Sequence, residues 1–242
     1  MKKRRSLPCL GRRLAGLVPA LAALVAFIPG ALADMVVVRS SGGALSPGQT
    51  VAAGAAVTLP AGESATLLDQ DGRTVTLTGP FSGVVGAADA PQGDPKVVTA
   101  LSRLLSAAAA DTSSLGIARG AALRDPYAID LRGGAHCQSA DRRPFFSRTA
   151  TVGAGSRLTI TAAGGSESTV IWRNAGRDAA WPAEDLPPLD GVYLLRLDDQ
   201  PTPVRLVFRR IPAEVQGAAA VAAWMADHGC AGQALALLNA LP

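Results

Sequence analysis

The chain is poor in aromatic residues and in the side chains on which most enzyme chemistry depends. Aromatic residues make up 4% of its 242 positions, and there are two histidines and three cysteines. The short motifs of nucleophilic hydrolysis, zinc-dependent proteolysis, phosphate binding and dinucleotide binding are all missing from the sequence. A catalytic triad would have to use His136 or His228. We therefore expect a non-catalytic protein that needs no cofactor.

Lysine is nearly absent once the first thirteen residues are set aside, and Lys96 is the only one that remains. The full chain has 23 basic and 19 acidic residues, but six of the basic residues lie in that leader, which leaves 17 basic against 19 acidic. A nucleic-acid partner calls for a basic stripe interleaved with aromatic side chains. The composition therefore excludes nucleic acid from the expected partners.

The N-terminal segment predicts export. Its basic leader precedes an apolar run of fifteen residues, from Leu14 to Ile28, and an Ala-x-Ala site ends at Ala33. This is the layout of a secretory signal peptide over residues 1–33, cleaved before Asp34, and it predicts a periplasmic protein. The alternative is an uncleaved membrane anchor, although a membrane-spanning helix needs roughly 20 apolar residues.

Alternating runs between turn residues predict a small antiparallel β-domain over residues 34–90. Strand candidates are Met35 to Arg39 and Gln49 to Leu59, the second interrupted at Gly54. The stretch ATLLDQDGRTVTLTGP predicts a hairpin that turns at Asp71-Gly72. Its second strand is expected to expose Thr74, Thr76 and Thr78 and to bury Val75 and Leu77.

The segment VAAGAAVTLPAGESATLLDQDGRTVTLTGP, residues 51–80, resembles the β-domain of the FecR-like family. The shared pattern is a Val-x-x-Gly strand, a Pro/Gly turn, and two strands joined by Asp-Gly that end in an apolar-Thr-Gly step. FecR-like domains are repetitive β-folds of the bacterial envelope, and some relay signals to sigma factors. The resemblance implies a sensing or protein-interaction module, although the basic leader is too short for the cytoplasmic segment of the signalling members.

Residues 91–130 are predicted to be a linker that contains one helix. Asp94 is placed to cap its N-terminus, and Pro95 suits its first turn. The helix is expected to end near Ala110, and residues 111–130 are expected to form a loop. Its apolar face, which we expect to dock on the chain's own domain, consists of Val97, Val98, Leu101, Leu104 and Leu105.

Residues 131–242 are predicted to form a β-sandwich-like domain capped by two helices, so that the fold class is mainly β with α. Four strand candidates lie at 149–162, 168–174, 191–199 and 202–212, with turn residues between them. One helix is expected from Pro212 to Gly229, where glycine suits a left-handed end, and another from Ala231 to Leu241. The aromatic core is expected to contain Trp172, Trp181, Tyr193 and Phe208.

Cys137 and Cys230 are the cysteines that remain when Cys9 is removed with the leader. In an oxidising compartment two cysteines are expected to form a disulfide. The alternative is a zinc site made by these two cysteines with His136 and His228, which lie beside them in the sequence. The spacing is not that of a zinc finger, so the predicted pair is the disulfide.

The carboxylate clusters are interpreted as turns. A glycosidase needs two carboxylates at a defined separation, but Glu184, Asp185 and Asp190 flank a Pro-Pro loop. Asp69 and Asp71 begin like a calcium loop and lack its third acid and its distal glutamate. We therefore expect no catalytic, cofactor-binding or metal-binding residue in these groups.

The remaining candidates for function are surfaces. Arg205, Arg209 and Arg210, with Arg196 on the preceding strand, predict a basic edge for an acidic polymer or a lipid head group, or else a solvated face. A strand edge of the N-terminal domain is suited to pair with a partner strand. The expected partner is an unidentified envelope protein or glycan, with membrane contact only through an uncleaved leader.

Two alternative functions stay open. A carbohydrate-binding or peptidoglycan-binding module predicts that Trp172 and Trp181 are exposed on the sandwich. A hydrolase of unrecognised type predicts that His136 or His228 lies in an open pocket beside a carboxylate.

Overall fold

The computed structural model describes residues 34–86, 94–115, 125–147, 155–172, 176–198 and 202–241. The expected signal peptide, with Cys9 and Ala33, lies outside the described residues, as do 87–93, 116–124, 148–154, 173–175, 199–201 and 242. Among the residues that are described, no helix is both long enough and apolar enough to cross a membrane.

The fold is mainly β with α, as the sequence predicts. The first strands are β1 (Met35–Ser41), β2 (Thr50–Val51), β3 (Ala55–Leu59), β4 (Ser64–Leu68), β5 (Thr74–Thr78) and β6 (Phe81–Val85), followed by helix α1 (Pro95–Leu115). The later strands are β7 (Ala128–Asp130), β8 (Gly134–Gln138), β9 (Phe145–Ser147), β10 (Arg157–Ala162), β11 (Glu167–Ile171), β12 (Asp178–Ala180), β13 (Gly191–Leu197) and β14 (Val204–Arg210). Helices α2 (Ala218–Asp227) and α3 (Ala231–Asn239) complete the described chain.

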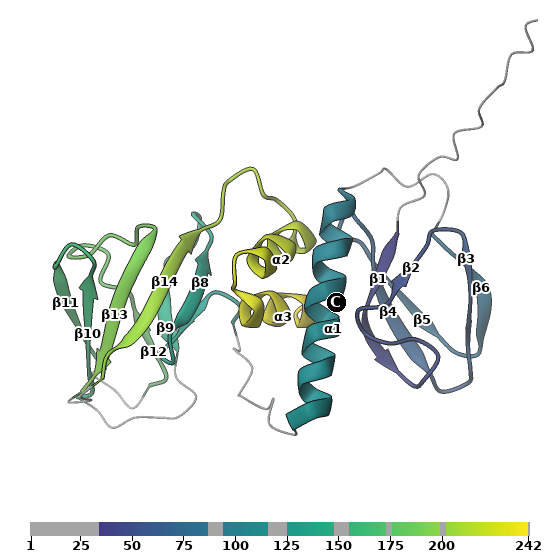
Figure 1. Ribbon diagram of the computed structural model, residues 1–242, viewed down its shortest axis with the longest axis horizontal. Helices are drawn as coiled ribbons and strands as arrows, with labels where there is room; N and C mark the ends of the chain where they lie inside the picture. Colours follow the sequence, from purple (N-terminus) through teal and green to yellow (C-terminus); the bar gives the residue numbers. More distant parts are fainter. Residues whose placement is uncertain are drawn as a thin grey trace, which may run out of the picture. The chain divides into compact units, whose positions relative to one another are not determined.

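The N-terminal strands form two sheets around a small core (Figure 1). One sheet has the order β2-β1-β4-β5, and the other pairs β3 with β6. The strand expected from Gln49 to Leu59 is interrupted near Gly54, as predicted, and its two parts belong to different sheets. The side chains that fill this core are Met35, Val37, Leu45, Val51, Val57, Leu59, Ala65, Leu67, Leu77 and Val85.

The hairpin between β4 and β5 turns at Asp71-Gly72, where Gly72 has a φ of +85°. The carboxylate of Asp69 accepts hydrogen bonds from the backbone N–H groups of Asp71 at 2.9 Å and Arg73 at 2.7 Å, which closes the turn. The expectation that Val75 is buried is wrong, because 36% of it is exposed. β5 is the edge strand of its sheet, so this side chain lacks a neighbour on one side.

Strand β1 is buried on both of its faces. Met35 and Val37 point into the N-terminal core, whereas Val36 and Val38 belong to a second cluster that includes α1. Successive side chains of a strand point to opposite faces, so four consecutive apolar residues can be buried only where both faces are covered. The run Met-Val-Val-Val is therefore explained by a sheet on one side and a helix on the other.

Helix α1 begins where the sequence predicts. The carboxylate of Asp94 accepts a hydrogen bond from the backbone N–H of Lys96 at 2.9 Å, which caps the first turn. The helix continues to Leu115, past the predicted end near Ala110. The added residues 111–115, Asp-Thr-Ser-Ser-Leu, lack the apolar periodicity that predicts a helix, which is why the sequence placed the end too early.

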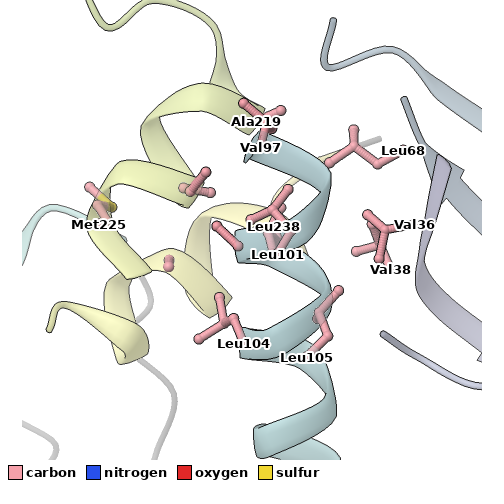
Figure 2. Packing of buried hydrophobic residues seen from close by; sticks show 14 of the residues in the cluster. Val36, Val38, Leu68, Val97, Leu101, Leu104, Leu105, Ala219, Met225 and Leu238 are labelled. Atoms are coloured by element: carbon pink, nitrogen blue, oxygen red, sulfur yellow. The ribbon is translucent and has the colours of Figure 1, made fainter. Parts of the chain in front are cut away.

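Buried side chains surround α1 on two sides, as Figure 2 shows. Val36, Val38 and Leu68 point toward the helix from the strands of the first sheet. Leu238 of α3 approaches from the other side, close to the fully buried Leu101. The apolar face of α1 thus docks on the chain's own core, as expected.

The later strands form a sandwich of two sheets (Figure 1). The order is β11-β10-β13-β14-β8 in the larger sheet and β12-β9-β7 in the smaller, with the pairs β14–β8 and β7–β9 parallel. The four strand candidates correspond to β10, β11, β13 and β14, whereas β7, β8, β9 and β12 were missed because they are short and show little alternation. The core contains the four predicted aromatic residues together with Phe146, Ile129, Leu158, Ile160, Val170, Leu186, Leu195 and Leu206.

The two C-terminal helices are present, but the first begins later than predicted. The segment after Pro212 forms a turn in which the N–H of Val215 bonds to the carbonyl of Pro212 at 3.1 Å. Gly217 then adopts a φ of +82°, which a continuous helix does not allow, and α2 starts at the next residue. Between α2 and α3, Gly229 has a φ of +83°, as expected for a left-handed connection.

Replacing Leu101 with alanine is expected to lower the free energy of unfolding by about 2–5 kcal/mol, because the side chain is fully buried between α3 and the first sheet. Urea unfolding followed by circular dichroism measures the change. Arg103→Ala, an exposed change on the same helix, serves as the control and is expected to shift the free energy by less than about 0.5 kcal/mol. Equal effects of the two substitutions would contradict the packing of α1.

Candidate functional site

Cys137 in β8 and Cys230, the residue before α3, form a disulfide with a Cα–Cα distance of 6.0 Å. This confirms the predicted pairing. The bond occupies both sulfurs, so the alternative zinc site with His136 and His228 lacks its two thiolate ligands. The pair holds the helical segment against the larger sheet, and both cysteines are buried.

Gln233 of α3 reinforces this attachment, and the sequence analysis did not single it out. Its side-chain oxygen accepts a hydrogen bond from the backbone N–H of Cys137 at 2.7 Å, and its amide nitrogen donates to the carbonyl of Cys137 at 3.0 Å and to that of Pro126 at 2.7 Å. β8 is an edge strand of the larger sheet. The buried amide thus takes the place of a neighbouring strand at this edge.

His136 lies on the face of β8 that points into the sandwich, and 2% of its surface is exposed. Its Nε2 lies 3.0 Å from the side-chain oxygen of Gln138, and its ring packs against Phe208 with 5.3 Å between centroids. Burial lowers the pKa of His136 to about 4, although the hydrogen bond to Gln138 acts in the opposite direction. This histidine is neutral at physiological pH and is enclosed by the core.

His228 lies at the C-terminal end of α2, half-buried beside Trp224. The two rings are stacked, with centroids 3.8 Å apart and planes inclined by 14°. The Nδ1 atom of His228 is 2.7 Å from the carbonyl oxygen of Trp224. Both rings line a hollow of about 270 Å³ that also contains Asp190. Among the described residues, no hydrogen bond or ion pair joins His228 to Asp190, whose carboxylate accepts the backbone N–H of Arg210.

The remaining carboxylates lie in turns, as expected. Glu184, Asp185 and Asp190 are exposed. One oxygen of Asp185 accepts a 3.3 Å hydrogen bond from the hydroxyl of Ser168. The loop that carries them is held by Tyr193, whose hydroxyl accepts the N–H of Leu189 at 3.0 Å and lies 2.9 Å from the carbonyl oxygen of the same residue.

The two tryptophans expected on the surface of a carbohydrate-binding sandwich are buried. Trp172 is 2% exposed and Trp181 is 5% exposed, and both belong to the core between the sheets. The indole nitrogen of Trp181 donates to the carbonyl of Leu186 at 2.6 Å. The carbohydrate-binding alternative required Trp172 and Trp181 to be exposed, and they are not. Any binding surface must therefore use other side chains.

The outer face of the five-stranded sheet carries the predicted arginines. In β14, Leu206 and Phe208 point into the core, so Arg205, Val207 and Arg209 point outward. The same alternation turns Arg196 outward in β13 and Arg157 outward in β10. We call Arg157, Arg196, Arg205 and Arg209 the arginine stripe.

The strand register orders the stripe along a diagonal. Arg205 pairs with Leu194, two residues before Arg196 in β13, and Arg196 pairs with Thr159, two residues after Arg157 in β10. Each of these steps covers about 8 Å between Cα atoms, given strands about 4.8 Å apart and a rise of about 3.4 Å per residue. Arg209 lies four residues after Arg205 on the same strand, β14, about 13–14 Å away and on the side opposite to Arg196. The arginines therefore cross three strands in one direction.

The predicted basic edge is thus a face. β13 and β14 are interior strands of their sheet, so their outward arginines lie in the middle of a surface. Arg210 does not belong to it, because its guanidinium donates to the carbonyl of Pro188 at 3.0 Å. Arg157, which the sequence analysis left out, does belong. Only the pairing of β10 with β13 places it beside Arg196, and a single sequence does not specify that pairing.

The guanidinium groups of the stripe form no ion pair within the described chain, although the carboxylate of Asp198 accepts the backbone N–H of Arg157 at 2.7 Å. The one ion pair among the described residues joins Arg132 to Asp130, away from the stripe. At the outward positions of β10, β11, β13 and β14 the one acid is Glu167, which lies 3.3 Å from the hydroxyl of Thr161. Four guanidinium groups on one exposed face thus keep their hydrogen-bond donors available for a ligand.

The stripe ends at the hollow described above. Arg209 lines this hollow together with Val192 and Val207 of the same outer face, and with Trp224 and His228 of α2. Its volume of about 270 Å³ is close to the lower end of the range of small-molecule sites. The candidate site is therefore a basic track with an aromatic hollow at one end.

Comparison of the chain with protein-family models, with curated proteins and with solved structures found no match. The resemblance to FecR-like domains stays a prediction.

Reducing the disulfide is expected to lower the free energy of unfolding by up to about 4–5 kcal/mol, because the bond closes a loop of 93 residues in the unfolded chain. Urea unfolding with and without a thiol reductant measures the loss. The double variant Cys137→Ala/Cys230→Ala should show the lower stability in both conditions. A wild-type midpoint that does not respond to reductant, with reduction verified by alkylation, would contradict the expectation.

The burial of His136 predicts that the folded protein loses stability in mild acid. Its pKa is about 4 in the folded chain and about 6.5 when unfolded, so only the unfolded state takes up this proton between those values. The contribution is fully present above pH 6.5 and is lost as the pH falls toward 4, by about 3 kcal/mol in total. Urea unfolding at pH 7 and pH 4.5 should show a smaller difference for His136→Asn than for wild type. Thr99→Ala, an exposed change that removes no titratable group, is the control and should keep the wild-type difference. An unchanged difference in His136→Asn would reject the assignment.

Proposed function

We propose that this chain is an exported, non-catalytic binding protein of the bacterial envelope. Its working surface is the outer face of the five-stranded sheet, and its binding partners are anionic. The observation that carries the proposal is the arginine stripe, in which four exposed guanidinium groups share one face and form no ion pair within the described chain.

The candidate catalytic side chains are engaged in contacts within the chain, which supports a binding role. Cys137 and Cys230 are consumed by the disulfide, and His136 is buried against Gln138 and Phe208. His228 lies in an open hollow, but its Nδ1 is occupied by its own helix. Asp190 lines the same hollow, but its carboxylate accepts the backbone N–H of Arg210, and no hydrogen bond joins it to His228 among the described residues.

Export to the periplasm is part of the proposal. It is supported by the layout of residues 1–33 as a secretory signal and by the disulfide, a bond that persists in oxidising compartments. A FecR-like N-terminal domain would then add a sensing or protein-interaction surface to the same chain. The disulfide and the shared core around α1 would keep the binding face in place during such interactions.

Photo-crosslinking in intact cells tests this function. A photoreactive amino acid placed at Thr169, an exposed outward position next to the stripe, should yield adducts of higher mass on illumination. The same group at Thr99, an exposed position of α1, is the matched control and should yield few adducts. Replacing all four stripe arginines with glutamine should reduce the Thr169 adducts several-fold.

Two results would contradict the proposal. Equal adduct formation at Thr169 with and without the stripe arginines would show that the face does not bind through charge. Recovery of the chain from the cytoplasm at full length, instead of from the envelope with Asp34 as its first residue, would overturn export. Intact mass of the recovered protein distinguishes the two N-termini.

A further inference from the structure

We propose that the arginine stripe, together with the hollow beside Trp224 and His228, is a binding track for an acidic polysaccharide. This inference rests on the proposed binding function and names its ligand class. It assigns the charged groups of the polymer to Arg157, Arg196 and Arg205, and one sugar ring to the hollow at the Arg209 end.

The spacing of the stripe suits a chain with repeated charges. Three arginines follow each other in steps of about 8 Å along a diagonal, and the fourth is about 13–14 Å further on. A compact anion such as phosphate would contact one or two of these groups and leave the rest unpaired. A linear polymer that carries a carboxylate or sulfate on successive sugars would engage all four.

The side chains around the stripe match the chemistry of sugars. Arginine binds a carboxylate with two parallel hydrogen bonds. Thr159 of β10 and Thr169 of β11 point to the same outer face and present hydroxyl groups, whereas the hydroxyl of Thr161 donates to Glu167. Hydroxyls both donate and accept hydrogen bonds, as sugar hydroxyls do. The face therefore offers groups both for the acids and for the neutral positions of a uronic-acid chain.

The hollow supplies the aromatic component that the buried Trp172 and Trp181 do not. Trp224 and His228 form a stacked pair beside Arg209, with Val192 and Val207 on the sheet side. A sugar ring has an apolar face of C–H groups and a polar rim. An aromatic and aliphatic wall next to a guanidinium presents both kinds of surface within about 270 Å³. Asp190 also lines the hollow, so the ring is placed there with its hydroxyl groups, which can donate to a carboxylate, toward Asp190 and its acid toward Arg209.

An acidic protein is a weaker match to this face. Protein interfaces are centred on a cluster of buried apolar or aromatic residues. The exposed large apolar residues on the outer face are Leu194 and Ile171, 42% and 50% exposed, and they occupy different rows of the sheet on β13 and β11. The charge is therefore more concentrated than the apolar surface, which favours a hydrated polyanion.

Binding of the purified protein to polygalacturonate, measured by calorimetry, tests the inference. Dextran, an uncharged polysaccharide, is the ligand control and should not bind. Arg196→Gln/Arg205→Gln should weaken the affinity for polygalacturonate by about a hundred-fold, since each lost charge-assisted hydrogen bond is expected to cost about ten-fold. The affinity of wild type should fall as the salt concentration rises.

A matched variant removes the same charge elsewhere. Arg103→Gln/Arg143→Gln changes two exposed arginines that lie off the outer face, and it should bind polygalacturonate like wild type. Equal weakening by both double variants would show that net charge and not the stripe controls binding, and would overturn the site. Trp224→Leu tests the hollow. It should bind polygalacturonate more weakly than wild type, with the same dependence of affinity on salt concentration.

Two further ligands separate this inference from the proposed function. If vesicles of phosphatidylglycerol or poly-glutamate bind through the stripe more tightly than polygalacturonate, the binding function holds and the polysaccharide assignment is wrong. If none of the three polyanions binds, the anion-binding face itself is rejected. Binding of polygalacturonate that the stripe variant loses and the matched variant keeps supports both.

Discussion

The two-sided burial of α1 is the constraint on which the rest of the fold depends. Val36 and Val38 of β1 cover one side of the helix, and residues of α2 and α3 cover the other. The small N-terminal sheets, with a core made largely of valine, leucine and alanine, leave one face of β1 for α1 to cover. A helix with apolar residues on two sides therefore lets each neighbour bury a face that would otherwise meet water.

The attachment of the helical pair to β8 is the second constraint. The disulfide and two of the three hydrogen bonds of Gln233 meet at Cys137, so one residue carries both a covalent and a polar connection. α2 then lies with Trp224 and His228 beside the outer face of the sheet, which creates the hollow at the end of the arginine stripe. The binding surface thus depends on a structural bond that lies outside it.

Much of the fold was predictable because local patterns agreed with it. The hairpin at Asp71-Gly72, the cap at Asp94 and the left-handed Gly229 each depend on the chemistry of one or two residues, and each is where the sequence predicts. The two predictions that were wrong also have local physical causes. Helix α2 begins late because of the backbone at Gly217, and Val75 is exposed because β5 is an edge strand. Alternation reports which residues share a face, but not whether anything covers that face.

The sequence by itself determined the fold class, the disulfide pair, the aromatic core of the sandwich and the arginines of β13 and β14, because these follow from composition, periodicity and the small number of cysteines. Only the tertiary structure decided that the arginines form a stripe and that Arg157 belongs to it. It also decided that His136 is enclosed while Trp224 and His228 line a hollow. The reason is that strand order and register are set by contacts between residues far apart in the chain, which no local pattern encodes.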